Sequence, residues 1–371
     1  MIDVPRETGG SSVTAMGTVI DHAIVIEAPE AAVQAYLDAF TDREWEVRVS
    51  SRGDFLAQLF ALELSSATRD ALAAPALWRT AATAEPERFL LHPPVALLAR
   101  LTADERRELY RLLAGWPGNK PERWPLVFRD AAALRALSGR EGIPVALMDR
   151  AAALSYPFAG GLAFSDFSVV AVEFPDPEVL FRFLQLASRV ESVIPRLRLS
   201  TAKSVSETLA YWTINYRNPF ALPLLEALAE SETVGGTELE SFLPGSIRHR
   251  LFDLSPEGVS HDLSLNSFMI AASLAAPLGE PADPAVFFAW FERQFQPVSP
   301  PFRFGDVLVL QSEDGETPVS YACAFIYEDL VFAKDPSGLG LWRFMRLAEL
   351  RQRNPHFARA DFVAWRRVPS P

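Results

Sequence analysis

Apolar residues recur every three or four positions through much of the N-terminal half of the chain. The segments PEAAVQAYLDAF (29–40) and DFLAQLFALEL (54–64) both have this spacing, which is typical of the buried face of an amphipathic helix. Further along, Thr102 and Glu105 have the spacing of a capping box at the start of another helical pattern. The pattern therefore predicts a mainly helical region from about residue 29 to 150.

Shorter patterns around this region predict both strands and helices. HAIVIEAP (22–29) alternates as a half-buried strand does, and FSVVAVEF (167–174) has the β-branched composition of a strand. The segment after it predicts a helix, because Asp176 can cap it and Pro177 fits its first position. SVSETLAYWTINY (204–216) again has helical spacing.

The C-terminal third changes from helical spacing to a period of two. A buried helix is expected over SLNSFMIAASL (264–274), and a second helix over 283–295, starting at Asp283 and Pro284. Strands are then expected at 305–311, 320–327, 329–335 and 361–368. Glu313-Asp314-Gly315 and Glu328-Asp329 supply turns between the first three of these strands.

These elements predict an α+β protein with more than one domain. The paired glycines and charges of ESETVGGTELE (230–240) indicate an internal boundary. We expect a flexible tail over residues 1–15, a mainly helical region over 16–235, and a domain of helices followed by an antiparallel sheet over 236–371.

Net charge and composition limit the kinds of molecule that the chain is expected to bind. The 371 residues carry a net charge of −12, which disfavours nonspecific binding to nucleic acid or to an anionic membrane. The basic segment 350–368 contains Phe362 and Trp365, and it is interpreted as the solvated face of a packed element. The lone Cys323 excludes an intrachain disulfide. With no secretory signal or long apolar span visible, we expect a cytoplasmic protein without membrane insertion.

Neither a cofactor nor a metal is expected. The five histidines are scattered, and no two have the one-turn helical spacing that directs two imidazoles at one metal. SGLGLW (337–342) lacks the third glycine and the lysine of phosphate-binding loops. Asp166 lies between aromatic residues and is either a buried acid or, as we favour, a turn or cap residue.

Several short motifs share their order and spacing with one known group of proteins. From FSDF (164–167) onward the chain resembles an uncharacterised bacterial family with a papain-like C-terminal domain, related to cell-wall peptidases of the NlpC type. The resemblance runs through LAYW (209–212), LPGSIRHRL (243–251), NSFMIAASL (266–274), FGDVLVLQ (304–311), YACAFIYEDLVFAKD (321–335) and WRFMRL (342–347). It covers about 200 residues and implies a helix start followed by an antiparallel sheet.

The resemblance also implies where chemistry would lie. In a competent member the helix start carries a cysteine and the second strand opens with a histidine, whereas this chain has Ser267 and Tyr321 there. The polar residue after the next strand is matched by Asp335, which follows Lys334. Cysteine attacks as a thiolate, but serine needs a base to take its proton, and tyrosine, with a pKa of ~10, is a poor one.

Ser267, Tyr321 and Asp335 are therefore expected to form a degenerate site, and Cys323 to be a core residue. The leading hypothesis is a non-catalytic binding or regulatory protein, a pseudoenzyme that serves as inhibitor, chaperone or scaffold for a partner protein such as a protease. One alternative is a serine-based amidase, peptidase or acyltransferase that uses Ser267. Another is a small-molecule or lipid-binding module.

Overall fold

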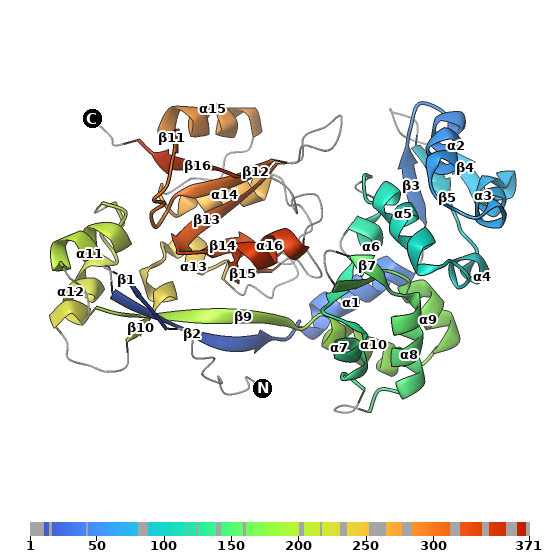
Figure 1. Ribbon diagram of the computed structural model, residues 1–371, viewed down its shortest axis with the longest axis horizontal. Coiled ribbons are helices and arrows are strands. Elements are labelled where there is room, and N and C mark those ends of the chain that lie inside the picture. The colour runs from blue at the N-terminus through green and yellow to red at the C-terminus, as the bar shows by residue number, and fades with distance from the viewer. Residues whose placement is uncertain are drawn as a thin grey trace. The chain divides into compact units, whose positions relative to one another are not determined.

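The structure is a computed structural model in which sixteen stretches of the chain are described. They are residues 11–14, 17–41, 44–80, 88–116, 118–123, 125–138, 142–158, 161–199, 204–215, 217–230, 236–251, 265–276, 284–311, 320–335, 341–353 and 362–368. These residues form helices and antiparallel sheets, which confirms the α+β class (Figure 1).

The chain divides into two compact units. Unit 1 comprises Met1–Ile26, Arg189–Pro336 and Gly340–Pro371, and unit 2 comprises Glu27–Ser188 with Ser337–Leu339. This division differs from the expected boundary near residue 235. The reason is a long antiparallel pairing between β2 (Gly17–Ile26) and β9 (Val190–Arg198), which joins segments on either side of unit 2 in one sheet. Unit 2 is therefore an insertion between two paired strands.

Unit 2 is mainly helical. Its described strands form two three-stranded antiparallel sheets, ordered β3-β5-β4 and β6-β8-β7. Its elements are α1 (Glu30–Thr41), β3 (Trp45–Arg48), α2 (Arg52–Ala61), α3 (Ser66–Ala73), η1 (Pro75–Leu77), β4 (Trp78–Thr80), β5 (Arg88–Leu91), α4 (Val95–Leu98), α5 (Ala103–Leu113), α6 (Lys120–Arg123), β6 (Leu126–Phe128), α7 (Ala131–Arg135), α8 (Val145–Leu154), β7 (Tyr156–Phe158), β8 (Gly161–Phe164), α9 (Phe167–Glu173) and α10 (Pro177–Ala187).

Two sequence predictions in unit 2 are confirmed by the caps of its helices. Thr102 and Glu105 form the expected capping box at the start of α5. Asp176 accepts hydrogen bonds from the backbone N–H groups of Glu178 and Val179 at the start of α10. Caps of this kind satisfy N–H groups that have no partner within the helix.

The prediction of a strand over 167–174 is wrong, because Phe167–Glu173 forms α9. The β-branched composition favours a strand, but tertiary packing overrides this weak preference. In α9 the side chains of Phe167 and Val170 are buried together, whereas Val172 is 64% exposed. The helix packs against α1, α4 and α8, so burial of one helical face determines the conformation.

Asp166 occupies the N-cap position of α9, as favoured, but its side chain is fully buried and makes no capping hydrogen bond to the helix. Its carboxylate accepts a hydrogen bond from Arg106 Nε at 2.6 Å and another from the Tyr110 hydroxyl at 2.6 Å. Arg106 also donates to the carbonyl of Leu98. The buried charges are thus paired, as a folded core requires.

Unit 1 contains two antiparallel sheets among its described strands. The smaller has the order β1-β2-β9-β10 and the larger β11-β16-β12-β13-β14-β15. Besides β2 and β9, its elements are β1 (Ser11–Thr14), α11 (Val205–Trp212), α12 (Leu222–Glu230), β10 (Thr237–Glu238), η2 (Leu239–Phe242), α13 (Gly245–Arg248), α14 (Leu265–Ser273), α15 (Pro284–Gln294), β11 (Phe295–Val298), β12 (Val307–Gln311), β13 (Ser320–Tyr327), β14 (Leu330–Lys334), β15 (Trp342–Arg346), α16 (Leu347–Arg353) and β16 (Phe362–Arg367).

The expected C-terminal helices and strands are present, with three additions. The segments predicted at 305–311, 320–327, 329–335 and 361–368 correspond to β12, β13, β14 and β16, while β11, β15 and α16 were not predicted. Glu328 and Asp329 form the expected tight turn, with Glu328 at a positive φ of 48°. Asp283 and the turn residues 313–315 lie outside the described residues. Residues 11–14 of the expected tail form β1.

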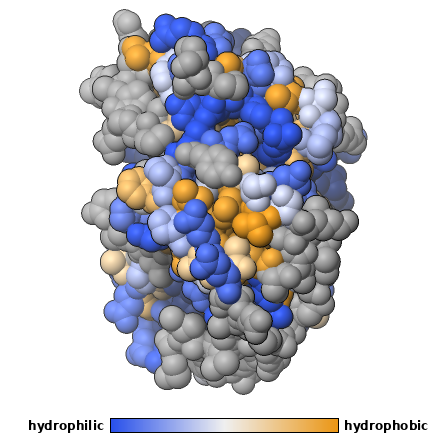
Figure 2. Space-filling model, turned by 90° about the vertical axis from the view of Figure 1, so that its left-hand side faces the viewer, coloured by the Kyte–Doolittle hydropathy of each residue, from blue (hydrophilic) through white to orange (hydrophobic). Residues whose placement is uncertain are grey.

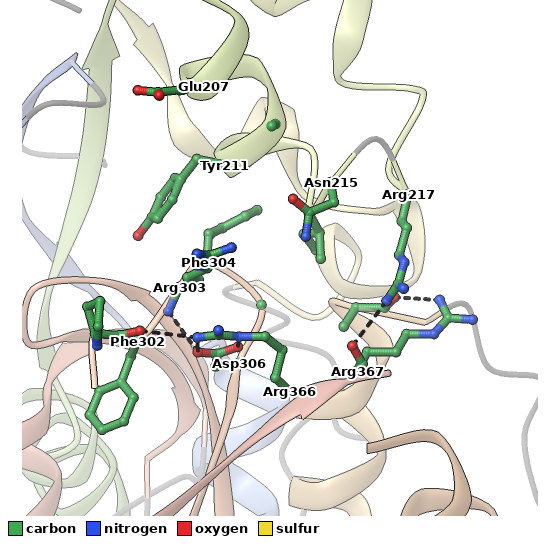
Figure 3. A pocket seen from close by; sticks show the side chains of 15 residues that line it. Glu207, Tyr211, Asn215, Arg217, Phe302, Arg303, Phe304, Asp306, Arg366 and Arg367 are labelled. Atoms are coloured by element: carbon green, nitrogen blue, oxygen red, sulfur yellow. Dashed lines mark hydrogen bonds and ion pairs between the residues drawn. The ribbon is translucent and has the colours of Figure 1, made fainter. Parts of the chain in front are cut away.

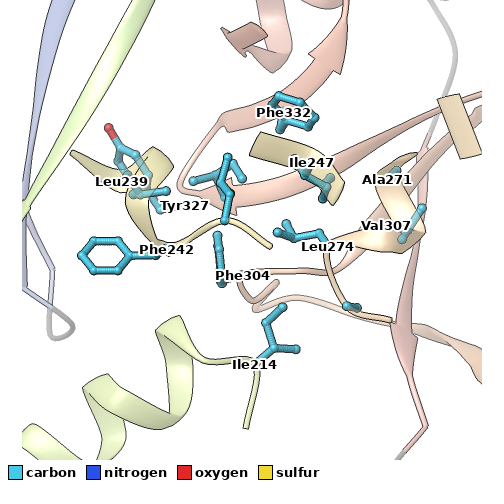
Figure 4. Packing of buried hydrophobic residues seen from close by; sticks show 14 of the residues in the cluster. Ile214, Leu239, Phe242, Ile247, Ala271, Leu274, Phe304, Val307, Tyr327 and Phe332 are labelled. Carbon is cyan, nitrogen blue, oxygen red and sulfur yellow. The ribbon is translucent and has the colours of Figure 1, made fainter. Parts of the chain in front are cut away.

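The larger sheet is buried on both faces. Side chains on one face pack in a cluster with Phe268, Ala271 and Ala272 of α14 (the α14-side cluster; Figure 4). The sheet contributes Val307, Val309, Ala322, Ala324, Phe332 and Phe344 to this cluster. The opposite face contributes Leu308, Leu310, Tyr321, Cys323, Val331, Ala333 and Met345 to a cluster with Leu350 of α16 (the α16-side cluster). Because side chains alternate along a strand, neighbouring residues of β13 belong to different clusters.

The acid dependence of unit 2 can be predicted from Glu105. Burial opposes ionisation of this carboxylate, but N–H donors from Thr102 and Ser65 and the Thr68 hydroxyl outweigh it and lower its pKa to about 2. A lowered pKa stabilises the fold above pH ~4.5, and the contribution is lost as pH falls towards 2. Glu105→Gln should therefore cost up to about 3 kcal/mol at pH 7 and much less at pH 2.

Urea unfolding at several pH values measures this difference. Asp104→Asn is the matched control, since Asp104 lies in the same first turn with a side chain that is 76% exposed. It should cost no more than about 0.5 kcal/mol. An equal cost of Glu105→Gln at pH 7 and pH 2 would contradict the proposed charge dependence.

A second prediction concerns the buried pair of Arg106 and Asp166. Asp166→Ala should lower the free energy of unfolding by about 3–5 kcal/mol, because it leaves a buried guanidinium without its carboxylate. Asp149→Ala removes the carboxylate of an exposed pair with Arg135 and should cost less than about 1 kcal/mol. Similar losses of unfolding free energy in the two variants, measured by urea unfolding, would show that the buried pair stabilises the fold no more than the exposed pair does.

Candidate functional site

Ser267 lies in the first turn of α14 and is fully buried. Helix α14 packs against β13, and the backbone N–H of Ala322 donates a hydrogen bond to Ser267 Oγ at 3.2 Å. The serine therefore occupies the expected position, at a helix start beside the second strand of the motif. Its hydroxyl oxygen is used as an acceptor that joins the helix to the strand.

Tyr321 lies next to Ala322, but its side chain points to the opposite face of the sheet. Ala322 belongs to the α14-side cluster, and Tyr321 belongs to the α16-side cluster. The Tyr321 hydroxyl donates to the backbone carbonyl of Lys334. Burial raises the pKa of this phenol well above its usual value, and the nearby Cys323 and Asp335 raise it further. The phenol is thus held protonated and cannot serve as a general base at neutral pH.

Asp335 directly follows β14 and is paired with an arginine. Its Oδ2 accepts hydrogen bonds from Arg343 Nε at 2.9 Å and Nη2 at 2.8 Å, with both side chains fully buried. Arg343 also donates to Glu349 Oε1 at 2.7 Å and to the carbonyl of Glu191 at 2.7 Å. This network ties β15 to β14, α16 and β9, so the carboxylate contributes to the packing of strands.

The structure therefore brings together only part of the predicted trio. Tyr321 and Asp335 lie close enough to interact electrostatically. Ser267 lies on the other side of the sheet, where it contacts the backbone of β13. Nucleophilic catalysis needs a base within hydrogen-bond reach of the attacking atom. The side chain of Tyr321 does not meet that requirement for Ser267.

Cys323 is fully buried in the α16-side cluster. Burial raises the pKa of its thiol far above the usual range, so the thiolate needed for nucleophilic attack is disfavoured. This location agrees with the prediction of a core residue.

A different part of unit 1 contains an open cavity of about 500 Å³, a volume typical of small-molecule sites. It lies between α11 with its following turn, the loop that precedes β12, and the end of β16 (Figure 3). Apolar contacts come from Ala210, Ile214, Phe302 and Phe304. The charged lining consists of Glu207, Arg217, Arg303, Asp306, Arg366 and Arg367. Arginine thus dominates the charge of the cavity.

The loop before β12 is held by glycine and by an ion pair. Gly305 has a φ of 89°, which is strained for any other residue, and a Cβ there would approach Ile214 Cδ1 to 2.9 Å and require that side chain to shift. The buried Asp306 carboxylate accepts from Arg366 Nε at 2.8 Å and Nη2 at 2.7 Å, and from the N–H of Arg303 at 2.7 Å. Its negative charge is therefore matched by Arg366.

Arg217 and Arg367 form the second positive group of the cavity. Arg217 donates to the backbone carbonyls of Arg367 and Val368, and Arg367 donates to the carbonyl of Ala275 at 2.7 Å. The structure records no carboxylate partner for either side chain among the described residues. Burial and the neighbouring charge of Arg217 lower the pKa of Arg367. Two like charges thus lie together in a partly buried site.

Tyr211 closes another side of the cavity. Its hydroxyl donates to the carbonyl of Ile326 at 3.1 Å, and burial raises its pKa above the usual range. Its ring lies at 6.4 Å from that of Phe304. The phenol therefore remains neutral and fixes α11 to β13.

Sequence reasoning missed this cavity, although parts of it carried a signal. The basic segment at 350–368 is expected to be a solvated face, whereas the structure shows Arg366 and Arg367 lining the cavity. Asp306 appears in the sequence only within the motif FGDVLVLQ (304–311). The other arginines, Arg217 and Arg303, lie about 90 residues apart in the sequence and share no motif. Only the tertiary fold brings them together.

No group of three or more His, Cys, Asp or Glu residues that could hold a metal ion occurs within the described ranges. Of the helices in these same ranges, none combines the length and the apolar character needed to cross a membrane. Neither a protein-family model, nor a curated protein, nor a solved structure matches the chain.

Proposed function

We propose that this chain is a non-catalytic binding or regulatory protein, a cytoplasmic pseudoenzyme that acts on a partner protein. The main support comes from Ser267, at the position where the sequence resemblance implies a nucleophile, because its buried hydroxyl oxygen accepts a hydrogen bond from the N–H of Ala322. Tyr321, which stands where the resemblance implies a base, is on the other face of the sheet. Loss of one member of such a catalytic unit removes most of its rate, and here two are replaced.

The order of elements supports a papain-like ancestry for the C-terminal part of the chain. A buried helix, α14, precedes an antiparallel run of β12, β13 and β14 and packs on its central strand. This is the order that the sequence resemblance implies for a papain-like domain. We infer that the scaffold has been retained while its chemistry has been lost.

The surface of unit 1 offers apolar contact area to a partner. Figure 2 shows apolar side chains gathered over α11 and α12. In this part of the chain Phe220 is 89% exposed and Val205 is 51% exposed. Exposed apolar groups of this kind favour contact with another protein. An inhibitor, chaperone or scaffold of a partner such as a protease is consistent with such a surface.

The cavity lined by arginines favours a second candidate, a small-molecule-binding module. Its volume and mixed lining fit a ligand with an apolar body and an anionic group. Ligand binding at this cavity and binding of a partner elsewhere on unit 1 are compatible roles.

Labelling with a fluorophosphonate probe tests the absence of serine hydrolase chemistry. We expect no adduct on Ser267 by mass spectrometry of the intact and digested protein. Ser267→Ala should instead lower the free energy of unfolding by about 1–3 kcal/mol, because a buried N–H loses its acceptor. Ser299→Ala, at an exposed position of the same unit, should change it by less than about 0.5 kcal/mol.

Stoichiometric labelling of Ser267, or amide hydrolysis that disappears in Ser267→Ala, would overturn the proposed function in favour of a serine hydrolase.

A further inference from the structure

The cavity contains positive charge that the fold itself does not neutralise. Asp306 is engaged by Arg366 and by the N–H of Arg303. Glu207 is the other carboxylate in the lining, and Figure 3 places it at the far side from Arg217 and Arg367. The positive charges of Arg217 and Arg367 are therefore not balanced by a carboxylate of the cavity lining, although the whole chain carries a net charge of −12.

Arg367 also has an unused donor. Its Nη1 is bound to the carbonyl of Ala275, but its Nε is buried and has no hydrogen-bond partner within the described part of the chain. A buried donor without an acceptor costs about 1–3 kcal/mol. Since this Nε is shielded from solvent, an anion bound in the cavity acts through its charge, which offsets the repulsion between the two guanidinium groups.

The chemistry of the two arginines indicates which anion fits. A phosphate monoester carries a charge of about −1.5 to −2 at pH 7 and three acceptor oxygens, whereas a carboxylate carries only −1. Guanidinium groups bind phosphate oxygens through charge-assisted and often bidentate hydrogen bonds. Two adjacent arginines thus match the charge of a phosphate monoester.

The rest of the lining suits an apolar body on the ligand. Ile214, Phe302 and Phe304 supply apolar and aromatic surface, and Arg303 provides a further charge beside Tyr211 (Figure 3). We propose that this cavity binds a small organic phosphate monoester, with the phosphate at Arg217 and Arg367 and its apolar part against these side chains. The assignment rests on the proposed function, since it treats the ligand as bound and not hydrolysed.

Isothermal titration calorimetry with phenyl phosphate at pH 8 and low salt tests this assignment. We expect saturable binding with one site per chain. Benzoate, inorganic phosphate and phenol should each bind at least about tenfold more weakly, since each lacks part of the charge or of the apolar body. Binding should weaken as salt is added, because the charges are partly exposed.

Variants of the full-length protein identify the site. Arg217→Gln and Arg367→Gln should each weaken phenyl phosphate binding by at least about tenfold. Arg303→Gln should fold even if those two variants do not, because the Arg303 side chain is exposed and makes no ion pair with a carboxylate among the described residues. It should weaken binding about threefold or more. Arg293→Gln, on the exposed side of α15, is the matched control and should bind as the wild type does.

The outcomes separate the two proposals. Absence of saturable binding, or unchanged affinity in Arg217→Gln, Arg367→Gln and Arg303→Gln, would overturn the phosphate site and leave the non-catalytic function untouched. Equal affinity for benzoate would replace phosphate with carboxylate as the ligand class and so overturn the assignment. Release of phenol from phenyl phosphate, followed by absorbance, would overturn the non-catalytic function instead.

Discussion

The alternation of side chains along β13 determines which groups can meet in unit 1. This strand is buried on both faces, so each of its residues belongs either to the α14-side cluster or to the α16-side cluster. A shift of one residue would exchange the two sets and bury each against the wrong layer. The register is therefore strongly constrained, and it separates the side chain of Tyr321 from Ser267. Chemistry between them would require a different strand register, not a small rearrangement of side chains.

The same constraint explains why polar groups at the expected site have structural roles. A buried hydroxyl, phenol or carboxylate is costly unless it is hydrogen-bonded. Ser267 accepts from a backbone N–H, Tyr321 donates to a backbone carbonyl, and Asp335 binds Arg343. Each interaction connects a strand to a neighbouring element. Their removal should therefore affect stability, which is a different signature from the loss of a catalytic group.

Much of the local structure was predictable because it depends on local signals. The capping box of Thr102 and Glu105 and the turn at Glu328 follow from short-range hydrogen bonding and backbone geometry. The failures have non-local causes. Helix α9 has the composition of a strand, and only its packing against α1, α4 and α8 determines its conformation. The pairing of β2 with β9 spans an inserted unit, so no pattern within either segment predicts it.

The cavity was unpredictable for a related reason, since its charges come from separate parts of the chain. Arg217 follows α11, Arg303 precedes β12, and Arg367 ends β16. Stability alone gives no reason to place Arg217 beside Arg367, because like charges in a partly buried site repel each other. Asp306 shows what a purely structural solution would be, a carboxylate in bidentate contact with Arg366. Folds tolerate unfavourable local interactions of this kind mainly at functional sites. Here an anionic ligand is the simplest group that would offset the repulsion between the two arginines.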